Sequence, residues 1–161
     1  MNQYIFAIDP GNTESGYALI QMPDFKLLQF GKTTNEMLLD NLPDMIAGAD
    51  AFAIEMVASY GMAVGKDVFE TCVWIGRFIQ AAKKEHTLVY RKDEKLCLCG
   101  SLKAKDSNIR QALIDRYAKF DFKSGKGVKK NPDTFYGVSK DAWQAIAVGV
   151  TYYEKLKENS I

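Results

Sequence analysis

Apolar residues run almost unbroken through residues 4–9 (YIFAID) and 51–57 (AFAIEMV). Short apolar runs of this kind predict strands that are buried on both faces of a sheet. Residues 10–12 (PGN) end the first run with residue types that favour turns. Residues 15–21 and 25–31 repeat the strand pattern after short connections, so the chain is expected to begin with three antiparallel strands.

Helical spacing of apolar residues dominates the rest of the chain. It predicts helices over residues 35–47, 62–83 and 106–117, and a last helix that begins after Ser139. Pro43 predicts a kink or break in the first of these helices, and a further strand is expected at residues 88–91. A three-strand antiparallel meander followed by two parallel strands predicts an α/β fold with a mixed sheet flanked by helices.

The composition suits one domain over residues 1–161. Of the 161 residues, 47% are hydrophobic and 25% are charged, which is enough for a sizeable core without disulfides or a structural metal. No apolar run is long enough to span a membrane, and the first residues lack the basic start of a signal peptide, so we expect a cytoplasmic protein. One histidine and three cysteines exclude catalysis by a histidine pair and argue against a zinc site.

Charge is unevenly distributed along the chain, although the net charge is only +1. Residues 1–50 carry two basic and seven acidic side chains, whereas residues 77–130 carry fifteen basic and six acidic ones. This pattern suits a protein that grips a polyanion beside a carboxylate site, and it equally suits a solvated surface on which the two halves balance. Residues 121–138, which hold four lysines, have no periodicity and are expected to be functional or mobile.

Three carboxylates lie at the ends of, or within, apolar elements. Asp9 closes the first buried strand, Glu55 lies inside the strand 51–57, and Asp141 falls in the first turn of the last helix. Asp9 alone suits a turn, Asp141 alone suits the helix dipole, and Glu55 requires a partner because an unpaired buried carboxylate is costly. The expected strand order places all three at one edge of the sheet, where a cluster of like charges requires a cation. Oxygen ligands without histidine or cysteine select Mg²⁺ or Mn²⁺.

Three motifs that carry these acids resemble a known family. IDPGNTESGYALI (8–20), AIEMV (53–57) and DAWQAIAVGV (141–150) are similar to the motifs of the RuvC Holliday-junction resolvases, a branch of the ribonuclease H-like fold. The stretches between them look most like small RuvC-like proteins of phage and prophage origin, which would act in a bacterial host cytoplasm. The resemblance implies a ribonuclease H-like sheet and a Mg²⁺-dependent endonuclease, with Mn²⁺ able to substitute, that cuts four-way DNA junctions in recombination and repair.

The resemblance also implies roles for individual residues. Asp9, Glu55 and Asp141 would be catalytic metal ligands, and Gln144 stands where the family commonly has a second acid on the last helix. An amide can still ligate there, but it leaves open whether one metal or two are bound. The family uses a lysine before the penultimate helix, and Lys103 or Lys105 would be its counterpart here; Lys105 is our candidate for the catalytic lysine.

Basic and aromatic residues near these positions are candidates for DNA binding. Tyr60 could stack on an unpaired base at a branch point, or pack against Met62. Lysines give phosphate contacts with little sequence preference. The basic candidates are Arg91, Lys92, Lys103 and Lys105, between the last strand and the next helix, and Lys126, Lys129 and Lys130, in what we expect to be a flexible loop.

Two symmetric cuts in a junction require two active sites, so a homodimer is expected, with the apolar helix 62–83 either as its seam or as a buried central helix. Other activities remain as alternatives. One is a nuclease of the same fold that acts on RNA, flaps or single strands, like the YqgF-like proteins. Another is a nucleic-acid-binding module without catalysis, which Gln144 in place of an acid would favour.

Overall fold

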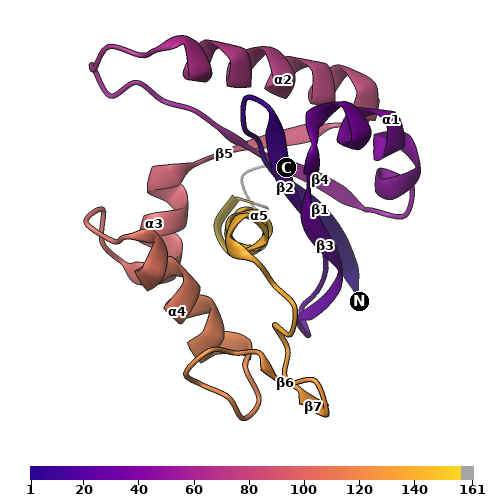
Figure 1. Ribbon diagram of the computed structural model, residues 1–161, viewed down its shortest axis with the longest axis vertical. Coiled ribbons are helices and arrows are strands. Elements are labelled where there is room, and N and C mark those ends of the chain that lie inside the picture. Colours follow the sequence, from indigo (N-terminus) through magenta and orange to yellow (C-terminus); the bar gives the residue numbers. More distant parts are fainter. Residues whose placement is uncertain (157–161) are drawn as a thin grey trace.

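A five-stranded mixed sheet forms the centre of the protein. The computed structural model describes residues 1–156, and its strand order is β3-β2-β1-β4-β5 (Figure 1). β1 (Gln3–Asp9) pairs antiparallel with β2 (Glu14–Met22), which pairs antiparallel with β3 (Lys26–Thr34). β1 also pairs in parallel with β4 (Ala51–Met56), which pairs in parallel with β5 (His86–Tyr90). The predicted meander and two parallel strands are therefore confirmed.

Helices cover both faces of this sheet (Figure 1). α1 (Asn35–Ile46) and α2 (Lys66–Ala82) pack on one face, whose buried cluster includes residues of both helices. The other face carries α3 (Arg91–Cys99), α4 (Asp106–Tyr117) and α5 (Lys140–Thr151). The π-helix η1 (Tyr152–Leu156) continues α5. A small hairpin of β6 (Gly127–Val128) and β7 (Asn131–Pro132) lies between α4 and α5 in the chain.

Alternation along β1 divides the core between these two layers. Ile5 and Ala7 are fully buried in the cluster that includes α5, whereas Phe6 and Ile8 are fully buried in the cluster that includes α1 and α2. Because successive side chains of a strand point to opposite faces, Asp9 falls on the α5 face of the sheet. This places the first predicted acid beneath the last helix.

Three expectations for the helices need correction. Pro43 lies within α1 without breaking it, so only a kink stays as a prediction. α2 begins at Lys66 rather than at residue 62. The nine-residue helix α3 was not predicted, because only Glu94 and Leu98 on it are buried and the segment reads as a run of charges. The Asp93 carboxylate accepts a hydrogen bond from the backbone N–H of Tyr90 at 3.1 Å, which starts α3, and Gly100 ends it at a φ of 67°.

The segment 121–138 is irregular, as expected, but a flexible loop was the wrong interpretation. The buried Asp133 accepts backbone hydrogen bonds of 2.7 to 3.2 Å from four residues, and Asp121 accepts three more. Burial raises the pKa of Asp133. The hydrogen bonds from these backbone N–H groups lower it by more, so the pKa lies below the usual range of an aspartate. The segment is held by the short β6–β7 hairpin and by hydrogen bonds to these two carboxylates. The four donors to Asp133 are the backbone N–H groups of Lys119, Phe120, Asp121 and Thr134.

No helix within residues 1–156 combines the length and apolar character needed to cross a bilayer.

Candidate active site

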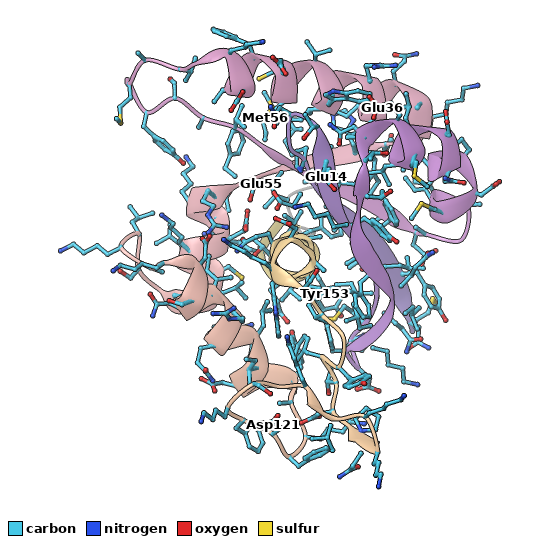
Figure 2. All side chains as sticks on the ribbon, in the orientation of Figure 1. Glu14, Glu36, Glu55, Met56, Asp121 and Tyr153 are labelled. Atoms are coloured by element: carbon cyan, nitrogen blue, oxygen red, sulfur yellow. The ribbon has the colours of Figure 1, made fainter. Side chains whose placement is uncertain are left out.

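The three predicted acids meet at the carboxyl edge of the sheet. Ile8 pairs with Ile54 across β1 and β4, so Asp9 and Glu55, each one residue further on, occupy the same edge. Glu55 lies on the face that carries α5, two residues after Ala53 of the α5-side core, and Figure 2 shows it beside that helix. Burial, and then the charges of Glu55 and Asp141, raise the pKa of Asp9 to about 8.

A glycine sets the separation between the strand acids and the helix acid. Gly16 of β2 pairs directly with Asp9 of β1. A Cβ atom added to Gly16 would lie 2.4 Å from the backbone oxygen of Asp141, closer than real contacts allow. The missing side chain therefore lets the start of α5 approach β2 and brings Asp141 to the Asp9 carboxyl group.

Glu94 of α3 is a fourth acid at this site, and the sequence reading missed it. Its side chain is 0% exposed, and its carboxyl group lies within hydrogen-bonding reach of that of Glu55. Burial first, and then Glu55, raise the pKa of Glu94 far above the usual range, while Arg91 opposes the shift. Its four-residue spacing from Leu98 places both on the buried side of α3, a signal that is useful only once α3 is recognised as a helix.

Arg91 joins three elements around these acids. Its guanidinium lies 3.3 Å from Oε1 of Glu94 and also contacts Oε1 of Gln144 and the carboxylate of Asp106. These contacts tie the start of α3 to α5 and to the start of α4. Arg91 was expected to bind DNA; its guanidinium group contacts these side chains, and DNA binding by Arg91 stays a prediction.

Lys32 is a second basic residue beside the acids, and the sequence analysis did not predict it. Its Nζ atom lies 2.6 Å from Oδ2 of Asp141, and the contact raises the pKa of Lys32. Lys32 belongs to β3, so only the observed strand order reveals its position near the last helix. Together with Asp9, Glu14 and Asp141, it lines a small hollow of about 220 Å³ at the sheet edge.

The donor set fits a hard divalent cation. Oε1 of Glu55 and Oε2 of Glu94 are buried without a hydrogen-bond partner, a costly state for carboxylate oxygens. The other donors are carboxylates and an amide, the oxygen ligands that Mg²⁺ and Mn²⁺ prefer. Within residues 1–156, no three acidic, histidine or cysteine side chains already stand together as a metal shell. Lys32 instead pairs with Asp141, and Arg91 contacts Glu94.

The DNA-binding candidates are spread over several surfaces. Tyr60 is 65% exposed with a φ of 50°. Met62 is also largely exposed, so packing of Tyr60 against it is not what the structure shows. Tyr60 lines a hollow of about 190 Å³ together with Arg91, Lys92, Lys95 and Leu102.

The remaining lysines lie further along the basic half of the chain. Lys103 and Lys105 are exposed at the start of α4, where Lys105 precedes the Asp106 that pairs with Arg91. Lys129 and Lys130 form the exposed turn between β6 and β7. Lys126 is half-buried and lines a hollow of about 330 Å³ with Arg110, Lys123 and Trp143, among others.

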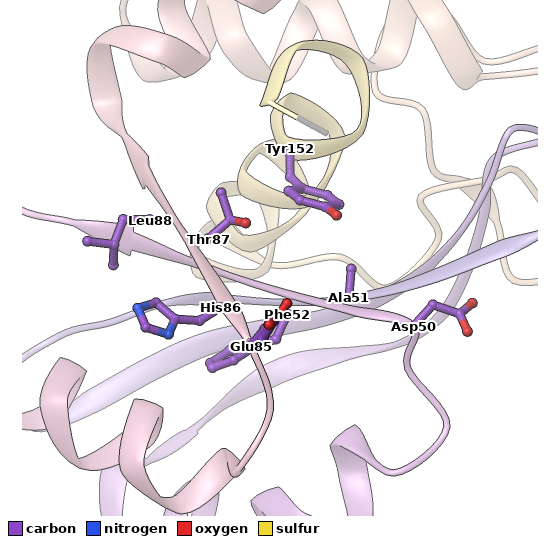
Figure 3. Close-up of a pocket in the computed structure, with 8 residues that line it drawn as sticks. All are labelled: Asp50, Ala51, Phe52, Glu85, His86, Thr87, Leu88 and Tyr152. Carbon is purple, nitrogen blue, oxygen red and sulfur yellow. The ribbon is translucent and has the colours of Figure 1, made fainter. Parts of the chain in front are cut away.

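A separate hollow of about 690 Å³ lies at the opposite edge of the sheet (Figure 3). It is lined by residues around the beginnings of β4 and β5 and by Tyr152, and it contains none of the four acids. His86, the single histidine of the chain, belongs to it. The predicted chemistry is therefore concentrated at the other edge.

Comparison with solved structures finds the same architecture in RuvC of Thermus thermophilus. Its complex with a Holliday junction substrate superposes with a TM-score of 0.75 over 98% of this chain and 97% of the other, at 14% sequence identity. A second Thermus thermophilus RuvC structure gives a TM-score of 0.73 over 99% and 97% of the two chains, also at 14% identity. No protein-family model and no curated protein sequence matches this chain. The protein therefore has the RuvC-like, ribonuclease H-like fold that its three motifs indicated.

Proposed function

We propose that this protein is a divalent-metal-dependent endonuclease that resolves Holliday junctions by paired phosphodiester hydrolysis. The observation that carries the proposal is the meeting of Asp9, Glu55 and Asp141 at one sheet edge, with a buried carboxylate oxygen of Glu55 left without a partner. The fold supports it, since a structure of the same architecture was solved with a Holliday junction substrate.

The acids would hold Mg²⁺, or Mn²⁺ in its place, from two directions. Asp9 and Glu55 would bind from the ends of β1 and β4, and Asp141 and Gln144 from the first two turns of α5. Bound there, the cations would supply activation of water and stabilisation of the leaving 3′ oxygen. Lys105, our candidate for the catalytic lysine, would offset charge on the oxygens of the scissile phosphate.

The surfaces beside the site would bind the branched substrate. The hollow that Tyr60 shares with Lys92 offers a stacking surface and positive charge close to Arg91, which suits an unpaired base at a branch point. Lys103, the hairpin lysines Lys129 and Lys130, and the nearby Lys126 would contact phosphates of the arms. These contacts give affinity and position without sequence preference.

A homodimer through α2 would provide the second active site. Thr71, Ile75, Phe78 and Ala82 are the buried residues of this helix. Its outer face exposes Phe69 and Val73, each more than 60% exposed, beside a shallow hollow of about 450 Å³ that includes Gly76. An apolar helix face of this kind suits a two-fold interface with a second copy of the chain.

A side-by-side cleavage assay tests the proposed activity. The substrates are a four-way junction, a flap, single-stranded DNA and structured RNA, each with Mg²⁺, with Mn²⁺ and with a chelator. We expect paired cuts in the four-way junction that depend on the cation. Cleavage of RNA alone would point to an RNA nuclease of the same fold, and binding without cleavage of any substrate would point to a non-catalytic module.

Three single substitutions test the assignment of the acids. Asp9→Asn, Glu55→Gln and Asp141→Asn should each abolish cleavage while junction binding persists, because each removes a ligand charge and also reduces repulsion of the phosphate backbone. Gel-shift titration in the presence of a chelator gives the binding, and product analysis gives the cleavage. Near wild-type cleavage by any one variant would remove that residue from the ligand set.

A further inference from the structure

Glu94 is the acid at this site that neither strand ends nor the motifs explain. It lies in the first turn of α3, its side chain is 0% exposed, and its Oε2 atom has no hydrogen-bond partner. A buried carboxylate of this kind is costly to the fold unless something binds the free oxygen. Arg91 engages only the other oxygen, Oε1.

The surroundings of Glu94 point to the cation site. Its carboxyl group lies against that of Glu55, whose Oε1 atom is likewise buried without a partner. Two neighbouring carboxylates repel each other when both are ionised, and a divalent cation is the ligand that relieves such repulsion.

Position 144 connects Glu94 to the acid that the last helix lacks. The same guanidinium nitrogen of Arg91 contacts Oε1 of Glu94 and Oε1 of Gln144. The side chains of Glu94, from α3, and Gln144, from α5, therefore lie on either side of this guanidinium group. Gln144 carries no charge, whereas Glu94 supplies one at this place.

We propose that Glu94 is the fourth carboxylate of the cation site, in place of the acid that is absent at position 144. The proposal rests on the nuclease function proposed above. It assigns α3 a direct part in holding the cation, beside β1, β4 and α5. It also gives Arg91 a positioning role, since Arg91 fixes Glu94 and Gln144 relative to each other.

Manganese binding to the metal-free protein, measured by calorimetric titration, tests this assignment without any cleavage assay. Glu94→Gln keeps the size of the side chain and removes its charge, and we expect Mn²⁺ affinity to fall by at least about tenfold. Glu85→Gln is the matched control, because Glu85 is exposed and lines the hollow at the opposite edge of the sheet. Its affinity should equal that of the wild type.

A charge swap separates a ligand role from a structural one. Gln144→Glu, added to Glu94→Gln, returns a carboxylate to the other side of Arg91 and should recover most of the lost affinity, while a cooperative melting transition shows that each variant is folded. Wild-type affinity in Glu94→Gln, or a loss that the swap does not recover, would overturn the proposal and leave Glu94 as a partner of Arg91 only.

Asp9→Asn serves as the reference that distinguishes this proposal from the function itself. If Asp9→Asn loses Mn²⁺ and Glu94→Gln does not, only the role of Glu94 is rejected. If the wild type binds no Mn²⁺, or if Asp9→Asn binds as the wild type does, the cation site and the proposed nuclease function fail together.

Discussion

The carboxyl group of Asp9 shows how a single residue can oppose the stability of its own fold. Asp9 is held beside Glu55 and Asp141 within a buried environment, and the charge of Arg91 compensates only in part. Like charges in such a place favour the protonated form. Repulsion among the acids therefore destabilises the metal-free protein, although the same charges would bind the proposed cation.

This repulsion predicts that the metal-free protein loses stability as pH rises. The ordinary pKa of an aspartate side chain is 3.8, whereas the pKa of Asp9 in the folded chain is about 8, so the folded state binds more protons than the unfolded state between these values. Stability is then fully present below about pH 4 and is lost progressively as pH rises toward 8. The raised pKa of Glu94 acts in the same direction.

Thermal melting in a chelator across this pH range measures the effect. We expect the Tm to fall with rising pH, and added Mg²⁺ to reduce the fall by binding the ionised site. Asp9→Asn should have a flatter profile, since it removes one of the titrating groups. A Tm that rises from pH 5 to pH 8 in the chelator would contradict this account.

At the scale of elements, α3 and the segment after α4 show where sequence patterns stop being informative. Helices with an apolar stripe, such as α1, were predicted nearly to their ends, and α4 over its full length. α3 has no such stripe, because one of its two buried residues is a glutamate. The 121–138 segment is ordered by side-chain acceptors, and the pattern of hydrophobic residues does not record these.

Asp133 is predicted to be the residue that orders this segment. Asp133→Asn replaces one acceptor oxygen by a donor and leaves backbone N–H groups such as that of Asp121 unpaired, at a cost of about 2 kcal/mol. For a chain of this size the Tm should fall by several degrees. Hydrogen exchange should accelerate across residues 119–134 and remain unchanged in β1. Unaltered exchange in that segment would show that the fold is held there by other contacts.

The lysines at and near the β6–β7 hairpin are predicted to bind DNA as part of an ordered element. Replacing Lys126, Lys129 and Lys130 with alanine should weaken junction binding and flatten its salt dependence by up to about three phosphate contacts. Lys155→Ala, an exposed change on η1, is the control. Fluorescence anisotropy at several salt concentrations measures both quantities. An unchanged salt slope would assign phosphate binding to Arg91, Lys92, Lys103 and Lys105 instead.

Across the whole molecule, the strand order brings residues that are far apart in the chain close together in space. Asp9, Glu55 and Asp141 were located from the sequence because each lies at the end of, or within, an apolar element and the order of those elements was clear. Lys32 and Glu94 were not, since one lies on a strand with exposed alternate positions and the other on an unrecognised helix. The cations that neutralise the site become visible only when the sheet is assembled.

The assembly of two molecules is predicted to depend on the outer face of α2. Phe69→Glu places a charge on an exposed apolar face and should convert a dimer into a monomer that still binds metal. Light scattering after size-exclusion chromatography measures the mass, with Leu28→Glu on the edge strand β3 as a matched control. We expect the monomer to lose coordinated cutting of both strands. A wild-type protein that is monomeric yet makes paired, symmetric cuts would exclude this interface.

The packing around Gly16 limits which residues position 16 can accept. It pairs with Asp9 and lies against the backbone of Asp141 without room for a methyl group. A change to alanine, which most strand positions tolerate, would here act first on the separation of the two acids. A residue with no functional group of its own therefore fixes how closely the carboxyl groups of two distant elements can approach.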